Sequence, residues 1–178
     1  LGKRPDVRSP MIKDFVPLAD LNDLEFAGWD IYDTDMYEMA KHSKVALPEQ
    51  IEAVKDELKK IKPMAAVFDP AFVKNISGPN VKKGKNKMDL AEQLMEDMKR
   101  CMKEKGAERA VMAWNGSTEA YMPPCEIHES LAAFEKALRD NDPRIAPSTI
   151  YAYAALSLGI PVRQRRAQLH RRQQGHPG

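Results

Sequence analysis

The sequence alternates short apolar runs with longer amphipathic stretches, and this alternation constrains the fold more than any other feature. Apolar runs at 24–31, 65–68 and 109–114 have the length of buried strands. Between them apolar residues recur at helical spacing, most clearly over 88–105, where Gly106 supplies the expected stop. Strands that alternate with amphipathic helices predict an α/β fold, a Rossmann-like parallel sheet with flanking helices.

Capping residues and prolines predict the remaining helices. We expect one capped by Thr34 or Asp33, one from Pro48 to Pro63, one over 129–139 and one from Pro147 to Gly159. Residues 74–87 are expected to form a polar loop.

Composition excludes several classes of protein. Of the 178 residues, 43% are hydrophobic, which favours a globular chain, yet no run approaches the roughly 18 apolar residues of a membrane span. No positively charged start leads into an apolar stretch, so no signal peptide is expected. Cys101 and Cys125 lack metal-ligand or redox spacing. We therefore expect a cytoplasmic protein without a metal site.

The basic residues are concentrated at one end of the chain. The formal net charge is +2, but residues 162–178 hold five of the 28 basic residues and no acid, which leaves 23 bases against 26 acids elsewhere. We therefore divide the chain into a folded part, 1–161, and an aberrant or disordered basic tail, 162–178. An arginine-rich arm that binds nucleic acid is the alternative interpretation of the tail.

The glycines do not form a phosphate-binding motif. No G-x-G-x-x-G occurs, and the stretch from Gly78 to Lys85 has the wrong glycine spacing for a Walker motif, with Asn86 where Ser or Thr would hold a metal. The four lysines of this stretch either contact a phosphate or form a solvated loop: Lys82, Lys83, Lys85 and Lys87.

Two places suggest ligand chemistry. Asp30 ends an apolar run, where an acid either accepts hydrogen bonds from both hydroxyls of a cofactor ribose or caps a turn. Residues 115–118 are small and polar and directly follow another predicted strand. Ligands of open α/β sheets bind at the carboxyl ends of the strands, so both places are candidates.

Five sequence strings, taken together, resemble the myo-inositol-1-phosphate synthase family, and the lysine-rich string resembles its bacterial branch. They are Lys-Asp-Phe-Val-Pro-Leu-Ala-Asp-Leu-Asn-Asp-Leu at 13–24, Gly-Trp-Asp-Ile at 28–31, Asn-Val-Lys-Lys-Gly-Lys-Asn-Lys at 80–87, Trp-Asn-Gly-Ser-Thr-Glu at 114–119 and Ile-Ala-Pro-Ser-Thr-Ile-Tyr-Ala at 145–152. The resemblance covers residues 1–161 in one collinear register.

The resemblance implies a partial NAD-binding domain and a set of cofactor contacts. Asp30 and Ile31 match the family's contact with the adenosine ribose, and Ala66 and Val67 match its contact with the adenine side. Asn115, Gly116, Ser117 and Thr118 match a nucleotide-binding turn. The implied cofactor is NAD.

The family is an isomerase of inositol and phospholipid biosynthesis. It converts D-glucose 6-phosphate to 1D-myo-inositol 3-phosphate by oxidation, aldol cyclisation and reduction, as a homotetramer that needs neither a membrane nor nucleic acid. Its glycine-rich pyrophosphate loop and its catalytic lysines have no counterpart between Leu1 and Gly178. We therefore assign no catalytic residue and expect the fragment alone to be inactive.

The tail has a specific explanation. Family members continue after Gly-Ile-Pro with a segment similar to Phe-Val-Asn-Gly-Ala-Pro-Asn-Phe-Thr-Val-Asp. That segment, written in GC-rich codons with one G inserted before the Phe codon, translates into the residues from Val162 to Arg172. We hypothesise that 162–178 is a frameshift product.

Two rival functions remain open. One is a non-catalytic interaction module with a nucleic-acid-binding tail, which a steep salt dependence of nucleic-acid affinity would support. The other is a different NAD-dependent enzyme on a similar scaffold, because a fold does not determine its chemistry.

Overall fold

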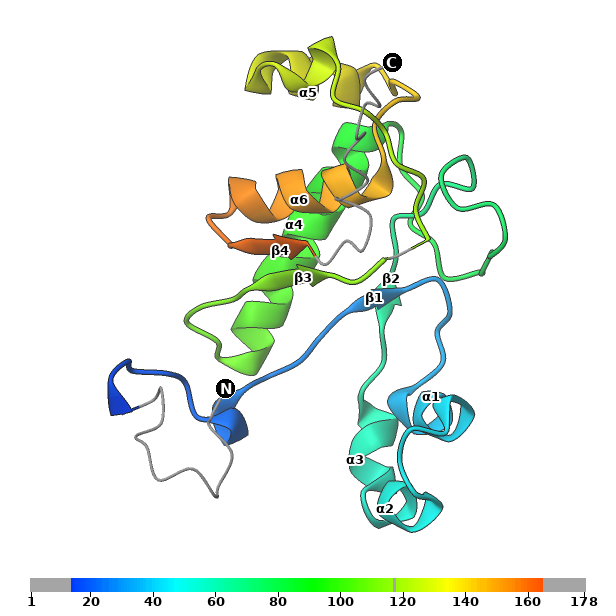
Figure 1. Ribbon diagram of the computed structural model, residues 1–178, viewed down its shortest axis with the longest axis vertical. Helices are drawn as coiled ribbons and strands as arrows, with labels where there is room; N and C mark the ends of the chain where they lie inside the picture. Colours follow the sequence, from blue (N-terminus) through cyan, green and yellow to red (C-terminus); the bar gives the residue numbers. More distant parts are fainter. Residues whose placement is uncertain (1–13, 117, 165–178) are drawn as a thin grey trace, which may run out of the picture.

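The computed structural model describes residues 14–116 and 118–164, in which helices pack around short parallel strands (Figure 1). In chain order the elements are η2 (Leu21–Asp23), β1 (Trp29–Asp30), α1 (Met36–Ser43), α2 (Pro48–Ala53), α3 (Lys55–Lys60), β2 (Met64–Ala65), α4 (Lys87–Lys105), β3 (Met112–Trp114), η3 (Glu126–His128), α5 (Leu131–Arg139), α6 (Pro147–Ser157) and β4 (Val162–Gln164). The predicted α/β class is confirmed, and β1, β2 and β3 are each shorter than the apolar run that predicted them.

The strands pair in parallel but form two small sheets within the described residues. β1 pairs with β2, Asp30 opposite Ala65, and β3 pairs with β4, Ala113 opposite Arg163. A parallel bridge between Ala66 and Val81 continues beyond β2. The single continuous sheet of the sequence prediction is therefore replaced by two separate pairs of strands.

The core lies where α4 packs against α6. Ala91 on α4 and Ala154 and Ala155 on α6 are fully buried, and their small side chains allow the two helices to approach closely. Leu94 and Ile150 fill the same core. Burial of this apolar surface is the main stabilising contribution to the helix pair.

Helix α4 matches its sequence prediction almost to the residue. The Asn86 side chain accepts a hydrogen bond from Asp89 N at 2.9 Å and so caps the first turn. Gly106 ends the helix with a φ of 64°, a left-handed conformation that glycine adopts without steric cost. Helix α5 starts at Leu131, two residues later than predicted, and α6 starts at Pro147 as predicted and ends at Ser157, two residues before Gly159.

Helices α1, α2 and α3 form a lobe at one end of the molecule, apart from α4, α5 and α6 (Figure 1). Tyr37 is buried in the lobe and donates a hydrogen bond to Glu52. Two sequence predictions fail here. The cap of α1 is Asp35 rather than Thr34 or Asp33, and the helix expected from Pro48 breaks at Val54 into α2 and α3.

The predicted boundary at residue 161 does not coincide with the end of the described fold. Val162–Gln164, assigned by sequence to the tail, form β4 and pair with β3. The rest of 162–178 lies outside the described residues, so its disorder stays a prediction. Among the residues that the structure describes, no helix is both long enough and apolar enough to cross a membrane.

Candidate functional site

The three segments that the sequence assigns to a cofactor meet at one side chain, Tyr151 on α6. Its ring centroid lies 5.3 Å from that of Trp29, which precedes Asp30, and 5.3 Å from that of Trp114, which precedes Asn115. Its hydroxyl oxygen accepts a hydrogen bond from Val67 N at 2.9 Å. Tyr151 is 3% exposed, and its burial raises the pKa of the phenol above the ordinary value. One buried ring therefore contacts all three segments.

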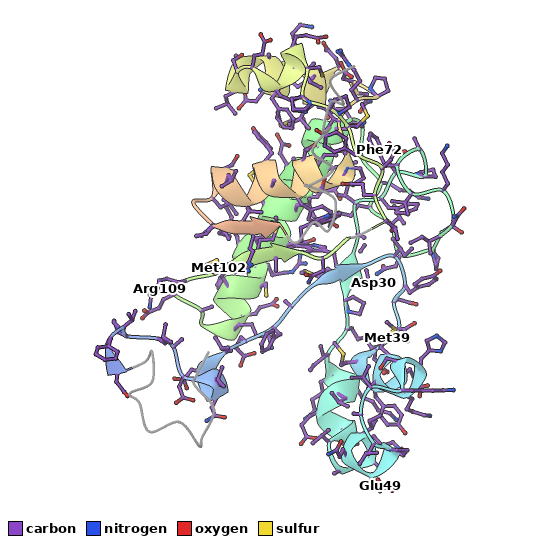
Figure 2. The ribbon with its side chains drawn as sticks, viewed as in Figure 1. Asp30, Met39, Glu49, Phe72, Met102 and Arg109 are labelled. Atoms are coloured by element: carbon purple, nitrogen blue, oxygen red, sulfur yellow. The ribbon has the colours of Figure 1, made fainter. Side chains whose placement is uncertain are left out.

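Asp30 lies at the carboxyl end of β1, near the junction of the strands with the α1–α3 lobe (Figure 2). Its Oδ1 accepts a hydrogen bond from Tyr32 N at 2.9 Å, so the carboxylate does form the turn expected of an acid at this position. Its Oδ2 has no hydrogen-bond partner within the described part of the chain. The same carboxylate can therefore close the turn and still accept a ligand hydroxyl.

Ala66 and Val67 are buried behind the strand ends, 6% and 5% exposed. Ala66 N donates to Asn80 O at 3.0 Å and Ala66 O accepts from Lys82 N at 2.8 Å, so the main chain of Ala66 is saturated. The N–H of Val67 is taken by Tyr151. Ala66 and Val67 can therefore offer a cofactor apolar contact, because the N–H groups of both residues and the C=O of Ala66 already form hydrogen bonds within the chain.

The turn after β3 packs onto the indole of Trp114. A Cβ at Gly116 would lie 2.7 Å from Cζ2 of Trp114, so no side chain fits at this position. Asn115 and Thr118 are exposed, whereas Ser117 lies outside the described residues. Packing against this indole therefore accounts for the glycine, and the side chains of Asn115 and Thr118 on either side of it face solvent.

Glu119 fixes the far end of this turn. It is 4% exposed, and its Oε1 accepts a hydrogen bond from Ser148 N at 2.9 Å. A carboxylate that accepts from the first turn of a helix satisfies an otherwise unpaired N–H and interacts favourably with the helix dipole. The turn is thereby tied to the same helix that carries Tyr151.

A buried charge network supports β1 from behind. Asp97 on α4, 4% exposed, accepts hydrogen bonds from Trp29 Nε1 at 2.9 Å, Lys82 Nζ at 2.8 Å and Arg100 at 2.6 Å. Burial opposes ionisation of this carboxyl, but the bonds from Lys82 and Trp29 outweigh it and hold the pKa of Asp97 below its usual range. Lys82 is therefore a structural partner.

The other loop lysines separate into two groups. Lys87 Nζ donates to two main-chain oxygens near the start of α6, each at 2.8 Å, and burial lowers the pKa of its ammonium. Lys83 and Lys85 are exposed. Of the four lysines considered for a phosphate, only these two remain oriented towards solvent.

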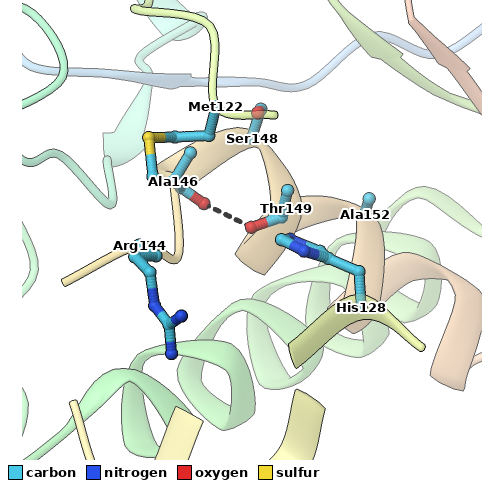
Figure 3. A pocket seen from close by; sticks show the side chains of 7 residues that line it. All are labelled: Met122, His128, Arg144, Ala146, Ser148, Thr149 and Ala152. Atoms are coloured by element: carbon cyan, nitrogen blue, oxygen red, sulfur yellow. Dashed lines mark hydrogen bonds between the residues drawn. The ribbon is translucent and has the colours of Figure 1, made fainter. Parts of the chain in front are cut away.

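A cavity of about 130 Å³ lies elsewhere, at the start of α6 (Figure 3). Its polar lining is largely satisfied: Thr149 donates to Ala146 O at 2.7 Å, and Arg144 pairs with Asp142 and Glu126. None of the predicted cofactor residues lines it. The candidate cofactor site is therefore not this cavity but the region at the carboxyl ends of β1, β2 and β3.

Sequence reasoning missed the side chains that join the site. Trp29, Trp114 and Tyr151 all lie within the strings that carried the resemblance, but no contact was assigned to them. The available signal was a tryptophan directly before Asp30 and another directly before Asn115. Among the described residues, no cluster of His, Cys, Asp and Glu is arranged to hold a metal.

Comparisons with known proteins agree on one family. The family model described as Myo-inositol-1-phosphate synthase matches residues 1–168. "Inositol-3-phosphate synthase 1" of Bacteroides thetaiotaomicron is 44% identical over 152 residues, which cover 85% of this chain and 35% of the relative. The inositol-3-phosphate synthase of Brassica napus is 27% identical over 84% of this chain and 30% of its own length.

A solved structure agrees with these relatives. The crystal structure of inositol-3-phosphate synthase from Caenorhabditis elegans superposes with a TM-score of 0.78 at 28% identity, over 87% of this chain and 32% of that one. The chain thus spans about a third of the length of the relatives it matches.

Proposed function

Because this chain belongs to the myo-inositol-1-phosphate synthase family, we propose that its strand ends bind the adenosine half of NAD. The observation that supports this most directly is the convergence of three predicted segments on Tyr151. Asp30 would accept the ribose hydroxyls through its carboxylate, with Ile31 beside it. The turn at 115–118, which Gly116 allows to pack on Trp114, would approach the nucleotide through main-chain N–H groups.

We further propose that the intact protein is an inositol-3-phosphate synthase. It would convert D-glucose 6-phosphate to 1D-myo-inositol 3-phosphate as a homotetramer in the cytoplasm. When bound, NAD supplies the hydride acceptance and return that such an oxidation and reduction require. The residues of this chain would bind and orient the adenosine end and take no part in proton transfer.

The chain alone should not turn over substrate. Half of a binding site contributes only part of the orientation on which the reaction depends. Incubating the purified 178-residue chain with glucose 6-phosphate and NAD, and assaying inositol phosphate, should give no product above a protein-free control. Measurable turnover would contradict this part of the proposal.

The cofactor site itself is tested by Asp30→Asn. Asparagine can still accept from Tyr32 N, but it lacks the charge that strengthens a bond from a ribose hydroxyl. We expect adenosine monophosphate to bind about tenfold more weakly, a loss of roughly 1.4 kcal/mol. NMR titration with millimolar ligand measures this directly.

Asp33→Asn is the matched control, because Asp33 is an exposed acid three positions away and the substitution changes the net charge equally. It should bind like the parent chain. A parent that does not bind the nucleotide, or equal losses in both variants, would argue against a ribose contact at Asp30.

A further inference from the structure

Residues 77–82, which we call the crossing segment, belong to the loop between β2 and α4. The segment crosses the carboxyl ends of β1 and β2 and includes Asn80. The last pair of the β1–β2 ladder is Asp30 with Ala65. Beyond it the strands part, and Asn80 takes the place of the next rung: its N–H donates to Ile31 O at 2.9 Å and its C=O accepts from Ala66 N at 3.0 Å. One residue thus bonds to both strand ends of the candidate site.

The side chain of Asn80 adds a third connection. Its Nδ2 donates to Asp30 O at 2.9 Å, and the carbonyl oxygens of Met64 and Tyr32 lie at 3.4 and 3.5 Å from the same nitrogen. Only the amide nitrogen can face three carbonyl oxygens, so the chemistry fixes the orientation of the amide. The residue is half-buried, which strengthens the bond relative to a solvent-exposed one.

Other contacts hold the crossing segment independently of this side chain. The Tyr32 hydroxyl donates to Ser77 O at 2.8 Å, and Lys82 N donates to Ala66 O at 2.8 Å. A Cβ at Gly78 would lie 2.2 Å from Ile31 O, so the chain can cross here only with a glycine. Removing the Asn80 side chain should therefore alter the strand ends without releasing the segment.

We propose that Asn80 is a positioning residue for the adenosine end of the cofactor, an inference that rests on the proposed function. By binding the main chain of Asp30 and Ile31 on one strand and of Ala66 on the other, it sets the separation of the two strand ends. The Asp30 carboxylate is already fixed to Tyr32 N, so the position of this main chain determines where its Oδ2 points. Asn80 acts through Asp30 and makes no contact with the reacting atoms.

The test compares Asn80→Asp and Asn80→Ala with Asn75→Asp in the 178-residue chain. A carboxylate at residue 80 would face carbonyl oxygens, and alanine removes the amide while keeping both main-chain bonds. Asn75 is exposed and five positions earlier, so Asn75→Asp carries the same charge change outside the crossing.

The readout is the ratio of the affinities for adenosine monophosphate and its 2′,3′-dideoxy analogue, measured by NMR titration. The parent should prefer the ligand with both hydroxyls about tenfold, and both Asn80 variants should lose most of that preference. Asn75→Asp should keep it. In an Asp30→Asn background, Asn80→Ala should change the ratio no further, because the two residues act on one contact.

Each alternative outcome is distinguishable. If Asn80 has a purely structural role, the Asn80 variants should bind both ligands more weakly by the same factor, in proportion to the unfolded fraction. The ratio of affinities would then be unchanged, and this result would overturn the positioning role. A parent that prefers the natural nucleotide together with Asn80 variants that keep the preference would refute this inference and leave the proposed function intact. A parent that binds neither ligand would refute both.

Discussion

The indole of Trp114 determines which residue can stand at position 116. The ring lies under the turn and against Tyr151, and the space that a Cβ would occupy at Gly116 is 2.7 Å from Cζ2 of the indole. Contacts this short force one partner to move. Since the ring is wedged between the turn and α6, the turn would have to lift away from β3.

Gly116→Ala should therefore destabilise the chain by about 1–3 kcal/mol, the usual range for overpacking. Urea unfolding at neutral pH measures the free energy of unfolding. Gly28→Ala is the matched control, because a Cβ at Gly28 meets no atom within 4 Å. Equal free energies of unfolding for the two variants would show that the turn can move away from the indole without loss of stability.

At this scale the sequence suggests candidate ligand residues but does not reveal the side chains that support them. Asp30 is a candidate because an acid at the end of a strand can accept hydrogen bonds from a ribose, and that role stays a prediction. Tyr151 and Asn80 could not be identified, because their contacts come from strands distant in the chain and depend on tertiary packing. A tyrosine in a helix pattern indicates a buried face and does not specify which strand ends that face meets.

Between elements, Asp97 joins α4 to β1 and to the crossing segment. Its folded-state pKa lies below the ordinary value of 3.8, so ionisation of this carboxyl favours the native state. The stabilisation is fully present above that value and is lost as the pH falls below it. Lys82, with its side chain 11% exposed, depends on Asp97 as its counter-ion.

Asp97→Asn should destabilise the protein at pH 7 by about 3 kcal/mol, because it leaves the Lys82 ammonium buried without a partner. The difference from the parent should shrink as the pH falls below about 4, where the parent loses the same charge. Urea unfolding of the parent and of Asp97→Asn at a series of pH values measures both the loss of stability at pH 7 and its decrease at low pH.

Glu96→Gln serves as the control for Asp97→Asn, since Glu96 is the exposed neighbour on α4 and loses the same charge. It should differ little from the parent at any pH. If Asp97→Asn lowers the free energy of unfolding by the same amount at every pH, the loss comes from the altered shape of the side chain and not from its charge.

Helix boundaries show where sequence reasoning stops. Gly106 gave the correct end of α4, because a glycine after the last periodic residue is a common helix stop, whereas the cap at Asn86 was not predicted. Residues 33–35 offer Asp, Thr and Asp in a row, so the sequence could not select Asp35 as the cap of α1. The break at Val54 follows no Pro or Gly and accompanies the packing of α2 and α3 around Tyr37.

At the scale of the whole molecule, β4 bears on the frameshift hypothesis. Parallel pairing of Met112 with Val162 and of Ala113 with Arg163 uses main-chain groups, which any residue except proline supplies. A strand at this position is therefore compatible with an altered reading frame. Resequencing the gene across the Pro161 codon decides the matter, and an in-frame read without displaced downstream similarity would reject the hypothesis.

The segment from residue 14 to residue 27 leaves the body of the molecule as an exposed arm (Figure 1). Six large apolar side chains on it are 42–79% exposed: Phe15, Val16, Leu18, Leu21, Leu24 and Phe26. An ion pair of Glu25 with Lys105 at 2.8 Å connects the arm to α4. Contiguous apolar exposure of this kind is typical of surfaces that another part of a protein covers.

The isolated chain should therefore self-associate through the arm. Phe15→Ser, Leu21→Ser and Phe26→Ser combined should lower both the average mass in sedimentation experiments and the binding of a hydrophobic dye, with little loss of stability because these three side chains are at least 73% exposed. Val45→Ser is the control, since Val45 is 89% exposed on the α1–α3 lobe and lies outside the arm. The arm drives association only if the triple variant is monomeric while Val45→Ser behaves like the parent; a parent chain that is monomeric and binds no dye would mean that its own side chains shield the arm in solution.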